Sequence, residues 1–269
     1  MAVQREGSYE SELRQVIGPG LLLVFIVGDL LGTGIYALIG EVAGYVGGMV
    51  WLPFLVAVLV AIFTASSYLE LVTKYPRAAG AAYFVHRAFR KPMFTFVVGF
   101  AVMCSGITSA ATASRAFAAH FSDAFGLDLE LGVVLVAALF LLGVAAINLR
   151  GVGESLVANV ILTFVELSGL LLVIVVGWMA VGRGEADPAR AWQFAPDASA
   201  WSAVTATTLA FFAMLGFEDS VNMVEETKNP TRVFPRAMIL GLGLTAALYV
   251  LVSIAAVAVV PPAELAGDE

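Results

Sequence analysis

The residues with the clearest chemical potential lie in an apolar segment near the amino terminus. Asp29, Gly32, Thr33 and Gly34 fall within a stretch long enough to cross a bilayer. Glycine weakens a helix, and a charge in lipid is rare unless the protein uses it. We therefore predict a helix break here, whose freed N–H groups could bind a carboxylate and whose freed carbonyls could bind an ammonium or a cation. A small-residue packing face is the alternative.

A second set of such residues lies in the middle of a later apolar segment, 200–225. Gly216 stands there, followed by Glu218 and Asp219. Interrupted helices at equivalent positions of two repeats are the best sequence indication of a transporter's binding site. Because five helices separate the two breaks, we expect the repeats to be inverted relative to each other.

The apolar segment 93–119 carries a polar stripe. Ser105, Thr108, Ser109 and Thr112 follow the spacing of one helix face, and we predict that they line a pathway. Hydroxyls in membrane helices also commonly bond to the preceding turn, which is the alternative for this stripe.

Two acids fall near mid-membrane, Asp29 and Glu166. A charge at a helix centre costs roughly 2.5–3.5 kcal/mol on insertion scales. Acids in that setting could exchange a proton at pH values near neutral, so we predict that one of them couples transport to protons. The alternative is that each stays neutral or bonds to backbone amides at the break.

The whole chain is built to hold these residues in lipid. Of its 269 residues, 60% are hydrophobic and 13% are charged, and the mean hydropathy is +0.93. This composition indicates an all-α polytopic membrane protein without an inserted soluble domain. The apolar runs predict seven transmembrane helices, at 17–44, 49–73, 93–119, 131–149, 154–181, 200–225 and 235–260.

Most of the fourteen Lys and Arg residues fall on one side of this arrangement if the amino terminus is cytoplasmic. The positive-inside bias therefore predicts that the amino terminus is cytoplasmic. We expect a multi-pass protein of the plasma (inner) membrane. Residues 1–16 would form a cytoplasmic tail, and 261–269 would lie outside the cell. Cys104 has no partner cysteine in the chain. We expect no cofactor, no metal and no nucleic acid, and the oligomeric state stays open.

Several motifs together resemble those of the amino acid–polyamine–organocation permeases, nearest to the branch of cationic amino acid transporters. The matching stretches are Gly32-Thr33-Gly34-Ile35-Tyr36, Gly40-Glu41-Val42-Ala43-Gly44, Tyr75-Pro76-Arg77, Phe212-Ala213-Met214-Leu215-Gly216-Phe217-Glu218 and Lys228-Asn229-Pro230-Thr231-Arg232. The resemblance implies an inverted-repeat (5+5) transporter fold with broken first and sixth helices, and alternating access. The substrate would be an amino acid or related amine, moved by proton coupling or exchange, or with sodium.

The resemblance also implies roles for single residues. The amides of Thr33, Gly34 and Ile35, beside Gly32, would meet the substrate carboxylate. The backbone around Ala213, Leu215 and Gly216 would meet the amino group. Phe212 would cover the substrate, and Glu218 would serve gating or protonation.

The chain departs from the family in length, because its second repeat has only two helices. We expect an incomplete form, a fragment or truncated gene product that does not transport on its own. A seven-helix receptor or photoreceptor is the main alternative, but segment 235–260 has no lysine for a retinal Schiff base. A membrane enzyme is disfavoured because the spans lack metal-ligand or Ser/Lys spacing.

Overall fold

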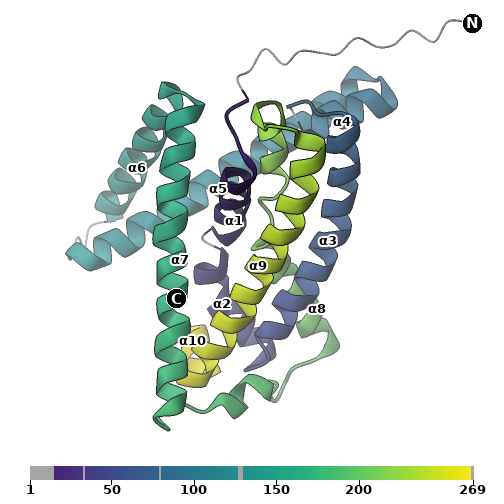
Figure 1. Ribbon diagram of the computed structural model, residues 1–269. Helices are drawn as coiled ribbons and strands as arrows, with labels where there is room; N and C mark the ends of the chain where they lie inside the picture. The colour runs from purple at the N-terminus through teal and green to yellow at the C-terminus, as the bar shows by residue number, and fades with distance from the viewer. Residues whose placement is uncertain (1–14, 33, 79, 127–129, 268–269) are drawn as a thin grey trace, which may run out of the picture.

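The computed structural model describes residues 15–32, 34–78, 80–126 and 130–267, and these fold into helices (Figure 1). The elements are α1 (Pro19–Leu31), α2 (Gly34–Val46), α3 (Trp51–Lys74), α4 (Gly80–Phe89), α5 (Pro92–Phe125), α6 (Glu130–Arg150), α7 (Val152–Gly182), η1 (Pro188–Trp192), α8 (Ala200–Phe212), η2 (Asp219–Glu226), α9 (Pro230–Val259) and α10 (Pro262–Gly267). The described part contains no strand beyond one isolated bridge, between Ile17 and Thr227.

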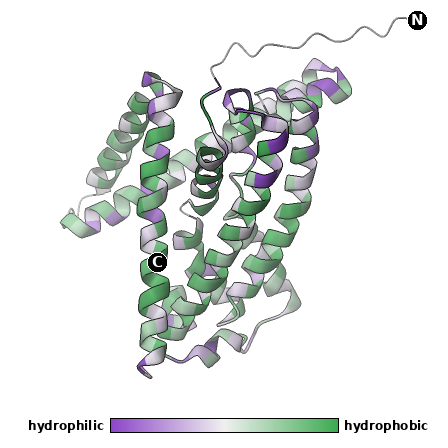
Figure 2. Cartoon of the chain, viewed as in Figure 1, coloured by the Kyte–Doolittle hydropathy of each residue, from purple (hydrophilic) through white to green (hydrophobic). Residues whose placement is uncertain are grey.

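Within the described residues, six helical stretches are long and apolar enough to cross a membrane, counting α1 and α2 as one stretch. Apolar residues cover most of their length (Figure 2). The segment at 200–225, where we expected a broken span, is divided. Its α8 has 13 residues, and the 3-10 helix η2 follows after a turn. The division lies at the glycine-containing stretch where the sequence predicts a break.

Helix α9 is the centre of the packing, and α1, α3 and α7 all lie against it (Figure 1). The core between them contains Ile26, Phe54, Phe234 and Tyr249, all fully buried. Helix α5 crosses behind the other helices in Figure 1 and packs against α4 and α6. Large apolar side chains on α5 and α6, such as Leu142, are exposed, as expected of surfaces that face lipid tails.

The end of the bundle that carries the segment before α1 is closed by backbone pairing. The Ile17 N–H donates to the Glu226 carbonyl over 2.9 Å, and the Lys228 N–H donates to the Ile17 carbonyl over 2.9 Å. The Ala78 N–H donates to the Glu225 carboxylate over 3.2 Å, which ties the start of α4 to the same place. The first half of the first broken helix is thereby joined to the end of the second.

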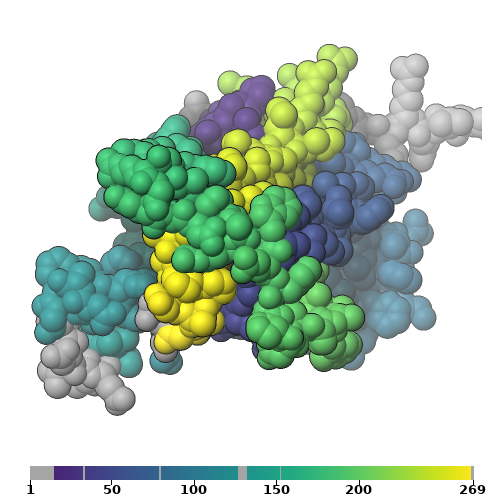
Figure 3. Space-filling model, turned by 90° about the horizontal axis from the view of Figure 1, so that it is seen from below, coloured from purple at the N-terminus to yellow at the C-terminus, as the bar shows by residue number. Residues whose placement is uncertain are grey.

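The opposite end is covered by the connection between α7 and α8, which Figure 3 shows in the view from below. The Trp51 indole N–H donates to the Ala191 carbonyl of η1 over 2.9 Å. Gly47 has a φ of +68°, and a Cβ there would meet the backbone of Ala195. Helix α10, which lies in the stretch expected to extend outside the cell, packs against α2.

Candidate functional site

The first helix break lies between α1 and α2. Gly32 has φ +37° and ψ −166°, a conformation that side chains disfavour, so glycine permits the chain to leave the helix here. Helix α2 then starts at Gly34. Thr33, which we expected to contribute an amide, lies outside the described residues.

The second break lies between α8 and η2. Gly216 has φ +131°, and a Cβ on it would stand 2.5 Å from the backbone oxygen of Asp29. The Gly216 N–H donates to a Glu218 carboxylate oxygen over 2.9 Å. Glycine is thus required both by the conformation and by the close approach of α1.

The two breaks meet each other in space. A Cβ on Gly34 would lie 2.7 Å from both the Cα and the Cβ of Ala213, so the start of α2 presses on the end of α8. Together with the contact between Gly216 and Asp29, this sets each half of the first broken helix against a half of the second. Segments almost two hundred residues apart in sequence thus form one site.

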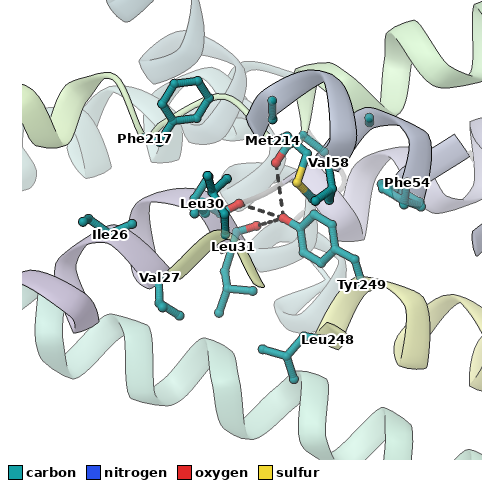
Figure 4. Packing of buried hydrophobic residues seen from close by; sticks show 14 of the residues in the cluster. Ile26, Val27, Leu30, Leu31, Phe54, Val58, Met214, Phe217, Leu248 and Tyr249 are labelled. Atoms are coloured by element: carbon teal, nitrogen blue, oxygen red, sulfur yellow. Dashed lines mark hydrogen bonds between the residues drawn. The ribbon is translucent and has the colours of Figure 1, made fainter. Parts of the chain in front are cut away.

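A buried tyrosine of α9 joins the breaks. The Tyr249 hydroxyl lies 2.8 Å from the Leu30 carbonyl oxygen, 2.6 Å from that of Leu31 and 3.4 Å from that of Ala213 (Figure 4). These carbonyls are ones that the interrupted helices leave without the usual intrahelical donor. The sequence analysis predicted freed carbonyls but did not identify Tyr249, because nothing local distinguishes it from other tyrosines of apolar helices.

A cavity of about 530 Å³ opens beside the two breaks. Its wall brings together many of the residues that the sequence singled out: Asp29, Gly32, Gly34, Ser105, Ser109, Thr112, Phe212, Ala213, Leu215, Gly216 and Glu218. Three of the four residues of the α5 hydroxyl stripe therefore face the same space as the backbone of both breaks. The volume, and the few polar groups in a mostly apolar wall, suit a small molecule with polar ends.

Three expected residues lie outside this wall. The Ile35 side chain is buried in the core. Thr108 is not part of the cavity lining, and its hydroxyl donates to the Cys104 carbonyl over 2.9 Å. Glu166 on α7 is also outside the lining, and its backbone carbonyl accepts a bond from the Tyr36 hydroxyl over 3.1 Å.

The lining also includes residues that the sequence analysis did not assign to a site. Tyr68 comes from the middle of α3, and Asp219 follows Glu218. Gly106, Ala110 and Ala113 lie beside the hydroxyl stripe on α5, and their small side chains at helical spacing could have indicated a surface that something approaches closely. No local pattern marks Tyr68.

The charged groups of the cavity wall are all acidic: Asp29, Glu218 and Asp219. Lys, Arg and His are absent from the lining among the residues that the structure describes. In the same part of the chain, no group of three or more His, Cys, Asp or Glu side chains is arranged to hold a metal ion. The site is therefore a negatively charged cavity with backbone polar groups at two helix breaks.

Two interrupted helices that meet beside a cavity with acidic groups, in a bundle of membrane-length apolar helices, are typical of secondary membrane transporters. The sequence of residues 21–269 matches the model of the amino acid permease family. The chain belongs to this family.

The similar curated proteins are named as transporters or permeases. An uncharacterized transporter of Mycobacterium tuberculosis is 33% identical over 255 residues, which are 95% of this chain and 55% of that protein. The branched-chain amino acid permease BcaP of Bacillus subtilis is 27% identical, over 97% of this chain and 58% of that protein. Cationic amino acid transporter 4 of Mus musculus is 30% identical, over 95% of this chain and 42% of that protein. The chain thus spans about half the length of these relatives, and they offer no support for a receptor.

Proposed function

We propose that this chain supplies the paired-break site of a secondary active permease, which moves an amino acid or related amine across the plasma membrane by alternating access. The observation that carries the proposal is the meeting of the breaks at Gly32 and Gly216 beside one cavity. Membership of the amino acid permease family supports it, as do two relatives that are named as a branched-chain amino acid permease and a cationic amino acid transporter. We place the amino terminus in the cytoplasm on the positive-inside bias. The protein acts as a carrier and not as an enzyme.

The substrate's carboxylate binds at the first turn of α2, in this proposal. The first N–H groups of a helix have no intrahelical acceptor and carry the positive end of the helix dipole. Gly34, at that turn, lines the cavity. The α-ammonium then lies toward the backbone of Ala213 and Leu215, and Phe212, half-exposed in the wall, covers the substrate.

Coupling to protons is assigned in this proposal to Asp29 together with Glu218. Both line the cavity, so a proton bound there would be close to the substrate. Burial without a counter-charge disfavours an ionised carboxylate, and neighbouring carboxylates disfavour it further. Sodium coupling or exchange are the competing mechanisms. Glu166, which does not line the cavity, is the second candidate for coupling.

The proposed function is tested by uptake of radiolabelled substrates. Cells that express the gene are compared with cells from which it has been deleted, using a panel of amino acids and diamines at several external pH values. We expect at least one amino acid to accumulate only when the gene is present, and faster at lower external pH. Equal uptake of every compound in both strains would refute the proposal.

A further inference from the structure

The basic side chains around α4 take no part in the site at the helix breaks. Helix α4 lies at the end of the bundle that carries the segment before α1, and it packs against α5 (Figure 1). Its Phe84 is buried and lies edge-on to the Tyr68 ring, with the ring centroids 6.4 Å apart, whereas His86 and Arg87 are exposed. Helix α4 thus has one face in the protein and a polar face outside it, as expected of a helix at a membrane interface.

The outer face of α4 and its flanks carry an excess of positive charge. The sequence from 71 to 122 contains no Asp or Glu, and its stretch 74–91 contains Lys74, Arg77, Arg87, Arg90 and Lys91. Within the part of the chain that the structure describes, neither Lys74 nor Arg87 forms an ion pair with an acid. The carboxylate of Glu225 accepts the Ala78 N–H, which precedes the opposite end of α4. These cations are therefore placed to attract an anion from outside the protein.

Two of the cations share one aromatic ring. The Lys74 Nζ lies 5.6 Å from the centroid of the Tyr75 ring, and the Arg87 Cζ lies 5.0 Å from the same centroid. The ring attracts each cation, but the two like charges repel each other. An anion beside the ring is attracted by both, and the planar fork of a guanidinium matches the oxygens of a phosphate. The arrangement therefore favours a phosphate group.

Aromatic side chains are exposed at the carboxyl end of the same helix. Phe89 is 59% exposed and Phe94, at the start of α5, is 48% exposed, and their ring centroids lie 5.6 Å apart. The Lys91 Nζ lies 6.0 Å from the centroid of the Phe94 ring. At a membrane interface, apolar rings lie among acyl chains while the adjoining cations reach the headgroups. This combination indicates a phospholipid as the source of the phosphate.

We propose that the α4 surface binds the headgroup of an anionic phospholipid, where the α4 surface comprises Lys74, Tyr75, Arg87, Phe89 and Phe94. The lipid phosphate lies beside the Tyr75 ring, within reach of Lys74 and Arg87, and the acyl chains lie against the two phenylalanines. The positive-inside bias places this end of the bundle at the cytoplasmic leaflet, whose surface is negatively charged.

The test compares two lipids that have the same acyl chains and differ in the charge of the headgroup. Native mass spectrometry of the purified protein in a neutral detergent measures the affinity for phosphatidylglycerol and for phosphatidylcholine. Each Lys or Arg near an anionic surface raises affinity about five-fold, so two should favour phosphatidylglycerol by about 10-fold to 30-fold. In the double variant Lys74→Gln with Arg87→Gln, this ratio should fall to about one. An unchanged ratio overturns the assignment of these two side chains.

The matched control is the double variant Lys228→Gln with Arg232→Gln. Both side chains are exposed and lie around the start of α9, at the same end of the bundle. This variant loses the same charge outside the α4 surface, so it should keep the preference for phosphatidylglycerol. An equal fall in the two double variants means that the general positive charge of this end attracts the lipid, and it overturns the specific site.

Two measurements on the unmodified protein test the inference without any variant. Equal affinity for the two lipids overturns it. Soluble glycerol phosphate that displaces phosphatidylglycerol at equal concentration shows that the surface binds soluble phosphates, and it overturns the choice of a lipid; the expected result is that phosphatidylglycerol stays bound. Each of these outcomes leaves the amino acid site unaffected, because the α4 surface lies outside the cavity lining.

Discussion

The contact between Gly34 and Ala213 allows a demanding test of the paired-break site. We predict that Gly34→Ala weakens both the fold and substrate binding. The added Cβ would stand 2.7 Å from the Cα and Cβ of Ala213, closer than real contacts allow. Because the Cα belongs to the backbone, α2 and α8 must move apart, and this movement widens the site where the two breaks meet.

The size of the effect follows from two opposing contributions. Overpacking a tight interior contact typically costs about 1–3 kcal/mol. Replacing glycine by alanine in a helix returns up to about 1 kcal/mol. With the full gain of about 1 kcal/mol, we expect a net loss of about 0–2 kcal/mol in the free energy of unfolding. A site displaced by the same strain should lose affinity by about 10-fold, which corresponds to 1.4 kcal/mol.

Gly243→Ala is the matched control. Gly243 lies within α9, and a Cβ there meets nothing within 4 Å. This variant gains the helix propensity without the collision, so it should be neutral or slightly stabilising. Unfolding in mixed micelles gives the stability of each variant. Calorimetric titration with an amino acid that the unmodified protein binds gives the affinity of each variant for that amino acid. If Gly34→Ala behaves like Gly243→Ala in both measurements, the two breaks do not pack as described.

Three other predictions test separate parts of the site. Tyr249→Phe should lower the free energy of unfolding by about 1–3 kcal/mol, because the buried carbonyls of Leu30 and Leu31 lose their donor. Tyr45→Phe, at an exposed tyrosine, is the control, and equal stability of the two variants would contradict the role of the Tyr249 hydroxyl. Thr112→Val should weaken substrate binding several-fold, whereas Thr108→Val should not, because Thr112 lines the cavity and Thr108 does not. An equal loss of affinity in both variants would remove the α5 stripe from the pathway. Asp29→Asn should flatten the rise of uptake with falling pH, because the proton that accompanies the substrate then has no carboxylate to bind. Glu166→Gln should leave the pH dependence of uptake unchanged, and the reverse pattern would assign proton coupling to Glu166 on α7.

The sequence alone was sufficient for the class of protein and for the positions of the breaks. Apolar runs of bilayer length predicted an all-α membrane protein, and the motifs around Gly32 and Gly216 indicated the permease family, which the family match confirms. These features are local, because hydropathy and the conformational freedom of glycine are properties of a few adjacent residues. The same local logic predicted a break within 200–225, where the structure divides the segment into α8 and η2, but it did not predict that η2 is a 3-10 helix.

The partners of each polar group were decided only by the tertiary structure. Asp29 and Glu166 looked equivalent in sequence, yet Asp29 shares the cavity wall with Glu218 and Asp219 and Glu166 does not. Tyr249 reaches carbonyls more than two hundred residues earlier in the chain. Which side chains meet across such distances depends on how α1, α8 and α9 pack together, and no pattern within one helix encodes that packing. The break at Gly32–Gly34 was thus visible in the sequence, whereas the acidic cavity beside it exists only in the folded bundle.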